Sequence, residues 1–125
     1  MSAAGHSEAD CPMTRLIGII SSKWAMPVIY NLLLADGPVR FGTLRDSIGK
    51  VTQRELSLTL KRFESLGIVN RKAYPVVPPR VEYTLTSLGR SLNEPIMALG
   101  KWGEKHAHEL ALKRSGARQP AAGKR

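Results

Sequence analysis

The sequence has 125 residues, of which 42% are apolar, and a formal net charge of +9, values typical of one globular domain with a strong excess of basic groups. No run approaches the roughly 18 uninterrupted apolar residues of a membrane span, and no basic residue precedes an apolar stretch at the N-terminus, so neither a membrane protein nor a secreted one is expected. The single cysteine, Cys11, excludes an internal disulfide and is typical of a reducing cytoplasm.

The basic residues are concentrated in the middle of the sequence and at its C-terminal end. Residues 40–90 carry ten basic and four acidic side chains, and residues 113–125 carry five basic and no acidic ones. Such regions attract polyanions, most often nucleic acids, because binding releases the counterions condensed on the phosphates. A solvated surface that keeps the protein in solution explains the charge equally well, so charge alone does not decide.

The first half of the sequence predicts three helices and a short strand. Residues 1–10 are small and polar, and we expect a flexible N-terminus there. Residues 11–21 predict a short helix with Pro12 in its first turn, and residues 21–37 a longer helix capped by Ser22. Residues 39–41 indicate a short strand, and residues 41–49 a helix that ends at Gly49.

Residues 52–67 give the clearest helix signal. Thr52 and Glu55 form the pattern of a capping box, in which the hydroxyl accepts an early N–H and the carboxylate reaches back. Leu56, Leu60 and Phe63 recur at helical spacing and predict the buried face. The opposite face then carries Arg54, Ser57, Leu58, Lys61 and Ser65, with Arg62 beside them.

A β-hairpin is predicted to follow. "IVNRKAY" and "VEYTL" are its two strands, and the connection holds Pro75, Pro78 and Pro79, directly before Arg80. Prolines stiffen the tip and deter edge-to-edge pairing. The alternating Val81, Tyr83 and Leu85 are expected to anchor the hairpin to the body of the domain.

A last helix, capped by Thr86, is predicted over residues 87–113, with Pro95 bending or dividing it. The basic segment 113–125 is rich in Gly, Pro and Ala and is expected to be disordered. The order of the elements is that of a winged helix-turn-helix, so the fold class is mainly α (α+β). In this architecture helix 52–67 enters the major groove of DNA while the preceding helix contacts the backbone.

Five blocks occur in a fixed order along the chain. They are "CP" near the N-terminus, "SSKWAMPVIYNLL", "GPVRFGTLRDSI", "VTQRELSLTLKRFESLGIVNRKAYPVVPPRVEYTLTSLGRSL" and "ALGKWGEKH". Together they resemble the HxlR family of bacterial winged-helix transcriptional regulators, which are related to MarR. The resemblance covers roughly residues 11–108, and its most specific part is "YPVVPPRVEYTLTSLGRSL".

The resemblance implies a homodimer that binds a palindromic operator, with a recognition helix in the major groove and the wing at the flanking minor groove. Arg54 suits a guanine edge and Gln53 an adenine, whereas Lys61 and Arg62 suit phosphate. Arg80 suits a narrow minor groove. The predicted contacts are Thr52, Gln53, Arg54, Ser57, Leu58, Lys61 and Arg62 in the recognition helix, and Arg71, Lys72 and Arg80 in the wing. The alternative is an ordinary solvated surface, and for Leu58 that alternative is as good as contact with a thymine methyl.

Cys11 matches the position of the sensing cysteine in the family, and we expect it to sense oxidants or electrophiles. The partial positive charge at a helix N-terminus lowers a thiol pKa, although Asp10 opposes this effect. An inert cysteine is the alternative. With one thiol per chain, any disulfide must join Cys11 to another molecule, for example Cys11 of a second subunit; otherwise the product is an adduct or a sulfenic acid.

The resemblance and the surplus of apolar residues predict a dimer interface, for which intramolecular core is the alternative. Its predicted members are Leu16, Ile20, Leu92, Ile96, Leu99 and Trp102. The domain boundaries are then a flexible N-terminus (1–10), a winged helix-turn-helix domain with dimerisation helices (11–112) and a basic disordered tail (113–125).

No metal site is expected, because His106 and His108 are two residues apart and cannot share a helix face. No catalytic set of residues is evident either, so we expect neither an enzyme nor a cofactor. The sequence predicts a cytoplasmic, nucleoid-associated bacterial regulator that binds operator DNA as a homodimer, with repression as the expected mode, an electrophile or small molecule as effector and no membrane partner. Two alternatives keep the fold: a basic module that binds RNA, and a winged helix that binds only a protein.

Overall fold

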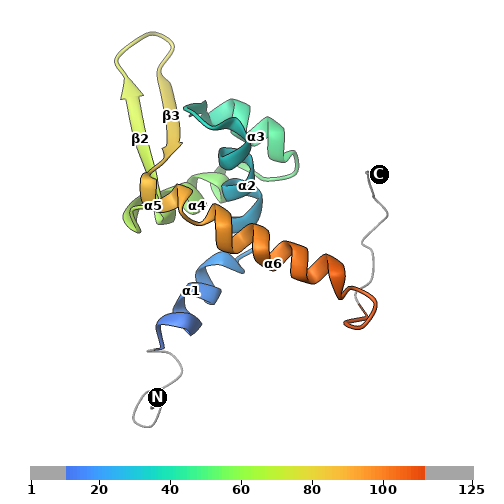
Figure 1. Cartoon of the computed structure of the whole chain (residues 1–125). Helices are drawn as coiled ribbons and strands as arrows, with labels where there is room; N and C mark the ends of the chain where they lie inside the picture. The colour runs from blue at the N-terminus through green and yellow to red at the C-terminus, as the bar shows by residue number, and fades with distance from the viewer. Residues whose placement is uncertain (1–10, 112–125) are drawn as a thin grey trace. The chain divides into compact units, whose positions relative to one another are not determined.

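The computed structural model describes residues 11–111, and these form six helices and three strands (Figure 1). The chain divides into two compact units, Met1–Ser91 and Leu92–Arg125. The predicted flexible N-terminus (1–10) and basic tail (113–125) lie outside the described residues.

The elements follow one another in the predicted order. The first unit contains α1 (Pro12–Ile20), α2 (Ala25–Ala35), β1 (Val39–Arg40), α3 (Phe41–Ile48), α4 (Gln53–Ser65), β2 (Val69–Tyr74), β3 (Arg80–Leu85) and α5 (Ser87–Arg90). The second unit contains α6 (Asn93–Lys105). A helix-turn-helix formed by α3 and α4, followed by the β2–β3 wing, confirms the predicted winged helix-turn-helix.

The core of the first unit lies where α2, α3 and α4 pack on the sheet. Leu56, Leu60 and Phe63 are fully buried, which confirms the predicted inner face of α4. Burial of each such side chain contributes about 1.5–3 kcal/mol, so this face holds α4 firmly to the body. The other buried apolar residues are Ala25, Val28, Ile29, Leu32, Leu44, Val51, Ile68, Val69, Tyr83 and Leu85.

Both ends of α4 are closed by hydrogen bonds. At the start, the Glu55 N–H donates to Thr52 Oγ1 (3.0 Å) and the Thr52 N–H donates to Glu55 Oε1 (2.9 Å), so the predicted capping box is confirmed. At the end, Gly67 has φ of 81°, a left-handed conformation that glycine adopts without strain, and the Ile68 N–H bonds back to the Phe63 carbonyl at 2.9 Å. Helix α4 therefore has a defined length and position.

The three strands form one antiparallel sheet in the order β1-β3-β2. Val69 lies opposite Leu85, Arg71 opposite Tyr83 and Lys72 opposite Glu82. The hairpin of β2 and β3 projects from the helical body (Figure 1). Tyr83 and Leu85 are buried and Val81 is half-buried, so the predicted anchoring face of the hairpin is confirmed.

Two predicted helix ends are wrong. The Ser22 hydroxyl donates to the Ile19 carbonyl (3.0 Å) at the end of α1 instead of capping α2, which begins after Trp24. The last helix ends at Lys105 instead of reaching residue 113. Its predicted division is confirmed: α5 ends at Arg90, α6 begins at Asn93, and Pro95 lies in the first turn of α6, where a missing N–H is tolerated.

Candidate nucleic-acid interface

The outward face of α4 presents the predicted recognition residues together. Because these side chains lie opposite the buried face, they project from the body without taking part in the core. Leu58 is among them, with 58% of its surface exposed, so it is a surface residue and not part of the core. The exposed residues of this face are Gln53, Arg54, Ser57, Leu58, Lys61 and Arg62.

Thr52 is exposed and directly precedes α4, but its hydroxyl is already engaged in a hydrogen bond within the protein. Its Oγ1 accepts the Glu55 N–H in the capping box. Thr52 therefore starts the helix and places Gln53 and Arg54 in its first turn, beside the N-terminal end where the helix dipole favours an anion.

The wing carries its predicted basic residues on two different faces. Arg71 pairs with Tyr83, so it lies on the face of the sheet that continues into the core. Lys72 pairs with Glu82, and Arg80 is two residues from Glu82 along β3, so both lie on the opposite face. The predicted set Arg71, Lys72 and Arg80 is thus not one continuous patch.

Arg80 does not lie at the tip of the wing, as the sequence suggested, but is the first residue of β3. The tip is formed by residues 75–79, and Val77 is 98% exposed there. Cross-strand pairing places the Arg80 guanidinium carbon 4.0 Å from the centroid of the Tyr74 ring. The sequence missed this contact because it depends on the register of the hairpin.

Glu82 completes the cluster around Arg80. The Tyr74 hydroxyl donates to Glu82 Oε1 (3.1 Å), and Arg80 Nε lies 3.5 Å from Glu82 Oε2, an ion pair that is too long to satisfy the buried Nε–H fully. The Arg80 side chain remains 34% exposed. Its guanidinium is therefore supported on one face and one edge, while the rest of the group is open to a partner.

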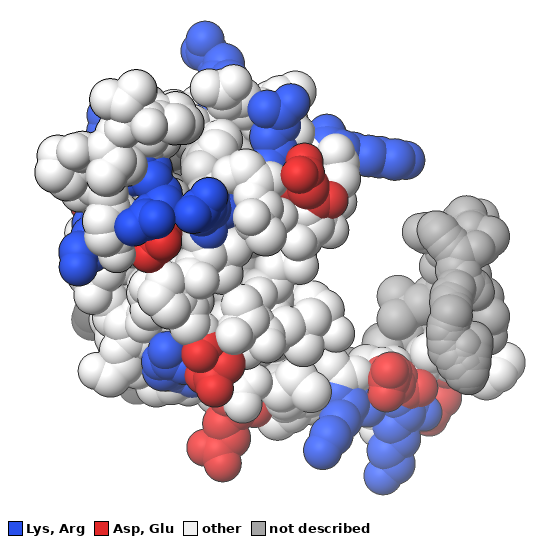
Figure 2. All heavy atoms as spheres, turned by 90° about the horizontal axis from the view of Figure 1, so that it is seen from above, with Lys and Arg blue, Asp and Glu red and all other residues white. Residues whose placement is uncertain are grey.

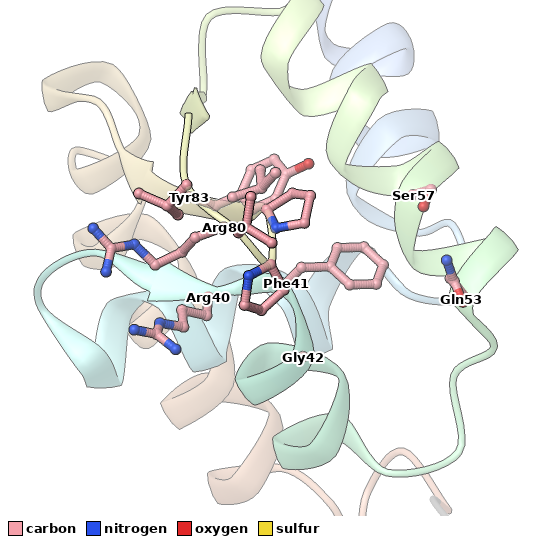
Figure 3. A pocket seen from close by; sticks show the side chains of 12 residues that line it. Arg40, Phe41, Gly42, Gln53, Ser57, Arg80 and Tyr83 are labelled. Atoms are coloured by element: carbon pink, nitrogen blue, oxygen red, sulfur yellow. The ribbon is translucent and has the colours of Figure 1, made fainter. Parts of the chain in front are cut away.

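A groove of about 520 Å³ separates the wing from α4. Phe41 and Tyr83 lie along it, with their ring centroids 6.4 Å apart, and Gln53 and Ser57 border it from α4 (Figure 3). Figure 3 also shows that the side chains of Arg40 and Arg80 point away from Gln53 and Ser57. The groove thus has a mainly apolar wall formed by the wing and by Phe41 of α3, and an uncharged polar wall on α4.

Arg40 is a basic residue of this region that the sequence reasoning missed. It is exposed, directly precedes α3 and pairs with Glu82 across β1 and β3, on the same face of the sheet as Arg80. A basic residue just before the first helix of a helix-turn-helix is the signal that could have identified it.

The charge balance of this surface is strongly positive. Figure 2 shows Lys and Arg side chains over the wing and the neighbouring helices, with fewer acidic ones between them. Two of the four acidic residues in segment 40–90 are already engaged, Glu55 in the capping box and Glu82 with Tyr74 and Arg80. Most of the positive charge is therefore available to a polyanion.

Cys11 is half-buried and is the N-cap residue of α1. The backbone N–H of Thr14, followed by that of Met13, lowers the pKa of the thiol, because these groups stabilise the thiolate. The direction agrees with the predicted effect of the helix N-terminus. Asp10, which was expected to oppose it, lies outside the described residues.

The predicted dimer residues lie on α1 in the first unit and on α6 in the second, except Leu92, which directly precedes α6. On α1, Leu16 is exposed and Ile20 half-buried; no residue of this described helix is fully buried, and Met13 and Ile17 are exposed as well. In the second unit, Leu92 and Ile96 are half-buried, while Leu99 and Trp102 are exposed. Each of the two helices therefore carries apolar surface that it does not bury within its own unit.

The described part of the chain was also compared with the requirements of a metal site and of a membrane-spanning helix. Within residues 11–111, no cluster of three His, Cys, Asp or Glu residues could hold a metal ion. No single helix there meets the length and hydropathy of a membrane span, and only α1 and α2 taken together, across a bend of 78°, do so.

Comparison with known proteins gives consistent matches. The family described as "HxlR-like helix-turn-helix" matches residues 19–111. The HTH-type transcriptional regulator YdeP of Bacillus subtilis is 42% identical over 100 residues, which cover 80% of this chain and 77% of YdeP.

Solved structures of transcriptional regulators are similar to this chain as well. The redox regulator HypR in its reduced form is 37% identical with a TM-score of 0.70, covering 81% of this chain and 98% of that one. Diamide-treated YodB from B. subtilis is 30% identical with a TM-score of 0.64, covering 76% of this chain and 93% of that one.

Proposed function

Because the chain belongs to the HxlR-like helix-turn-helix family, and is therefore a winged-helix transcriptional regulator and not an enzyme, we propose that it binds a palindromic operator as a homodimer. The observation that carries this proposal is the exposed basic face of α4, which is capped at both ends and borders the groove beside the wing. In the proposed complex α4 lies in the major groove, where Arg54 and Gln53 contact base edges and Lys61 and Arg62 contact phosphates. Repression is the expected mode.

A DNA-binding assay tests the proposal directly. Fluorescence anisotropy with fragments from upstream of its own gene and of neighbouring genes should show tight binding to one palindromic site. Affinity should fall steeply between about 50 and 200 mM salt, because phosphate contacts release counterions. Binding to random RNA of equal length should be much weaker. Equal affinity for the RNA would favour the alternative of an RNA-binding module.

Charge reversal on α4 separates specific contact from general electrostatics. Arg54→Glu and Lys61→Glu should each abolish operator binding at the salt concentration where the wild-type protein binds. Lys101→Glu, which makes the same charge change at an exposed position of α6, is the matched control. If all three variants lose affinity equally, net charge and not the α4 surface determines binding.

We further propose that Cys11 senses oxidants or electrophiles. Its support is the lowered pKa of the thiol at the start of α1, together with the likeness to HypR and to YodB, which are solved in oxidised and in diamide-treated forms, respectively. Diamide should change operator affinity in the wild-type protein and leave Cys11→Ser unaffected. The same response in both proteins would show that the thiol is not the switch.

A further inference from the structure

The sequence block "YTLTSLGRSL" contains a threonine and a glycine, three residues apart, that the proposed DNA contacts do not explain. Thr86 directly follows β3, and Gly89 lies within the four-residue helix α5. Both lie at the base of the wing, where its second strand returns to the helical body (Figure 1). The contacts of these two residues join three elements: α4, the wing and α5.

Thr86 bonds to the segment that leads from α4 into the wing. Its hydroxyl donates to the Gly67 carbonyl at 2.6 Å, and its backbone N–H donates to the Ile68 carbonyl at 2.9 Å. The same hydroxyl oxygen accepts the Gly89 N–H at 3.0 Å and so caps α5. Gly67 and Ile68 are also the residues whose N–H groups close the end of α4. One residue therefore ties the end of α4 to both strands at the base of the wing.

Gly89 is buried because two segments of main chain approach each other closely there. A Cβ at this position would overlap the Ile68 carbonyl oxygen and would lie 2.9 Å from Leu85 Cδ2. Gly89 is part of a helix, so its backbone conformation is open to any residue, and only the lack of space requires glycine. A main-chain carbonyl cannot rotate aside as a side chain can, so any larger residue must displace α5 from the base of the wing.

The other end of α5 is bound as well. Arg90 Nη1 lies 2.6 Å from Asp36 Oδ1, and Asp36 is the residue that ends α2. This exposed ion pair contributes little to stability, but it restricts the positions open to α5. A helix of only four residues is therefore connected to the ends of both α2 and α4.

We propose that Thr86 and Gly89 are positioning residues that hold the wing and the end of α4 as one rigid unit. This inference rests on the proposed operator binding, in which α4 and the wing contact the same DNA at two places. A wing with a fixed base adds its contact at little cost in conformational freedom once α4 is bound. Neither Thr86 nor Gly89 contacts DNA in this view; they act through Arg80 of the wing.

A double-mutant cycle in operator binding tests this role. In the wild-type protein, Arg80→Ala is expected to weaken binding about tenfold. Thr86→Val keeps the shape of the side chain and removes the hydroxyl, so it should loosen the wing and weaken binding about threefold. In the Thr86→Val background Arg80→Ala should then cost only about threefold, a coupling typical of residues in one network. Arg54→Ala, in the first turn of α4, should cost the same in both backgrounds.

Two further variants separate positioning from a general loss of stability. Thr86→Ser keeps the hydroxyl and should restore the full cost of Arg80→Ala. Val28→Ala removes buried methyl groups from α2, so it lowers stability without altering the wing, and it should leave the cost of Arg80→Ala at about tenfold. An equally reduced cost in Thr86→Val and Val28→Ala would show that Thr86 acts through stability alone.

Replacement of Gly89 gives an independent readout that needs no DNA. In Gly89→Ala the amides of β2 and β3 should exchange hydrogen faster than in the wild-type protein, while those in the middle of α4 should not. Gly37→Ala is the matched control, because a Cβ there would meet its nearest neighbour, the Ala35 carbonyl oxygen, at an ordinary 3.9 Å. Circular dichroism identifies loss of the fold, and if Gly89→Ala does not fold, the Thr86 variants decide.

The outcomes separate this role from operator binding itself. An unchanged cost of Arg80→Ala in the Thr86→Val background, or wing amides of folded Gly89→Ala that exchange at the wild-type rate, would overturn the positioning role and leave the proposed function untouched. Arg80→Ala without effect in the wild-type protein would overturn it too, since a wing without a contact needs no fixed position. Failure of the wild-type protein to bind any operator fragment would defeat the proposed function, and the positioning role with it.

Discussion

Arg80 illustrates how a single side chain depends on its neighbours in this wing. Its guanidinium lies over the aromatic ring of Tyr74 and beside the carboxylate of Glu82, and these two contacts set its direction. The basic residue was recognisable in the sequence, but its partner Tyr74 is known only once the register of β2 and β3 is known. Prediction from sequence therefore identified the charge and misplaced it at the tip.

Replacing Arg80 tests whether the wing contributes to binding. Arg80→Ala should weaken operator affinity about tenfold, within the range for one base or groove contact, and should reduce the salt dependence by about one counterion. Arg80→Lys keeps the charge but not the planar group that stacks on Tyr74, so it should recover only part of the affinity. Unchanged affinity for Arg80→Ala would show that the wing does not contact the operator.

Glu55 makes stability depend on pH in a predictable direction. Its folded-state pKa is lowered, first by the Thr52 N–H of the capping box, so the unfolded chain binds the proton more readily, and the ionised carboxylate stabilises the fold above the unfolded pKa of about 4.3. This stabilisation is lost as pH falls through the lower, folded-state pKa. Urea unfolding should show the wild-type protein to be more stable than Glu55→Gln at about pH 7, with the difference beginning to shrink as pH falls below about 4.3 and vanishing below the folded-state pKa. A difference that is independent of pH would contradict the role of the ionised carboxylate.

At the scale of elements, local signals predicted α4 and the hairpin well. The Thr52–Glu55 pair and the spacing of Leu56, Leu60 and Phe63 depend only on residues within one helix, and they set its start and its buried face. Contacts between elements could not be predicted in this way. Ser22 was expected to cap α2, but its hydroxyl bonds to α1.

The capping box provides a test of the element itself. Thr52→Ala removes the hydroxyl that accepts the Glu55 N–H and should lower the free energy of unfolding by about 1 kcal/mol. Thr52→Ser keeps the acceptor and should lose much less. Urea denaturation with a constant m-value measures both, and equal stability of the two variants would mean that the hydroxyl does not stabilise α4.

At the scale of the whole molecule, α1 and α6 leave large apolar side chains exposed to solvent in a single chain. In the described part of α1 no residue is fully buried, although Met13, Leu16 and Ile17 are large and apolar. The helices and their apolar sides were predictable from spacing. Whether a side chain meets its own chain or a second copy is not encoded in spacing, so the assignment of Leu16 and Ile20 to a dimer interface remains a prediction.

Disrupting α1 should therefore change the assembly before it changes the fold. Leu16→Glu should convert the proposed dimer to a monomer, measured by sedimentation, because burying a carboxylate in an apolar interface is strongly unfavourable. Operator affinity should fall with it, since two linked recognition helices bind far more tightly than one. Leu34→Glu, the same change at an exposed leucine of α2, is the control and should stay dimeric. A dimeric Leu16→Glu protein would place the interface elsewhere.

The pairing of β2 with β3 also limits how the chain can change in length. Val69 and Arg71, at odd positions, share a side with Tyr83, whereas Lys72 and Tyr74, at even positions, share a side with Arg80 and Glu82. Removing one residue inside β2 reverses this odd–even parity on one side of the deletion, so every side chain there moves to the opposite face of the hairpin. Arg71 and Lys72 would then exchange faces. Adding or removing residues among positions 75–79 leaves the parity unchanged. Related chains are therefore expected to vary in length at the tip and to keep the residue count of both strands.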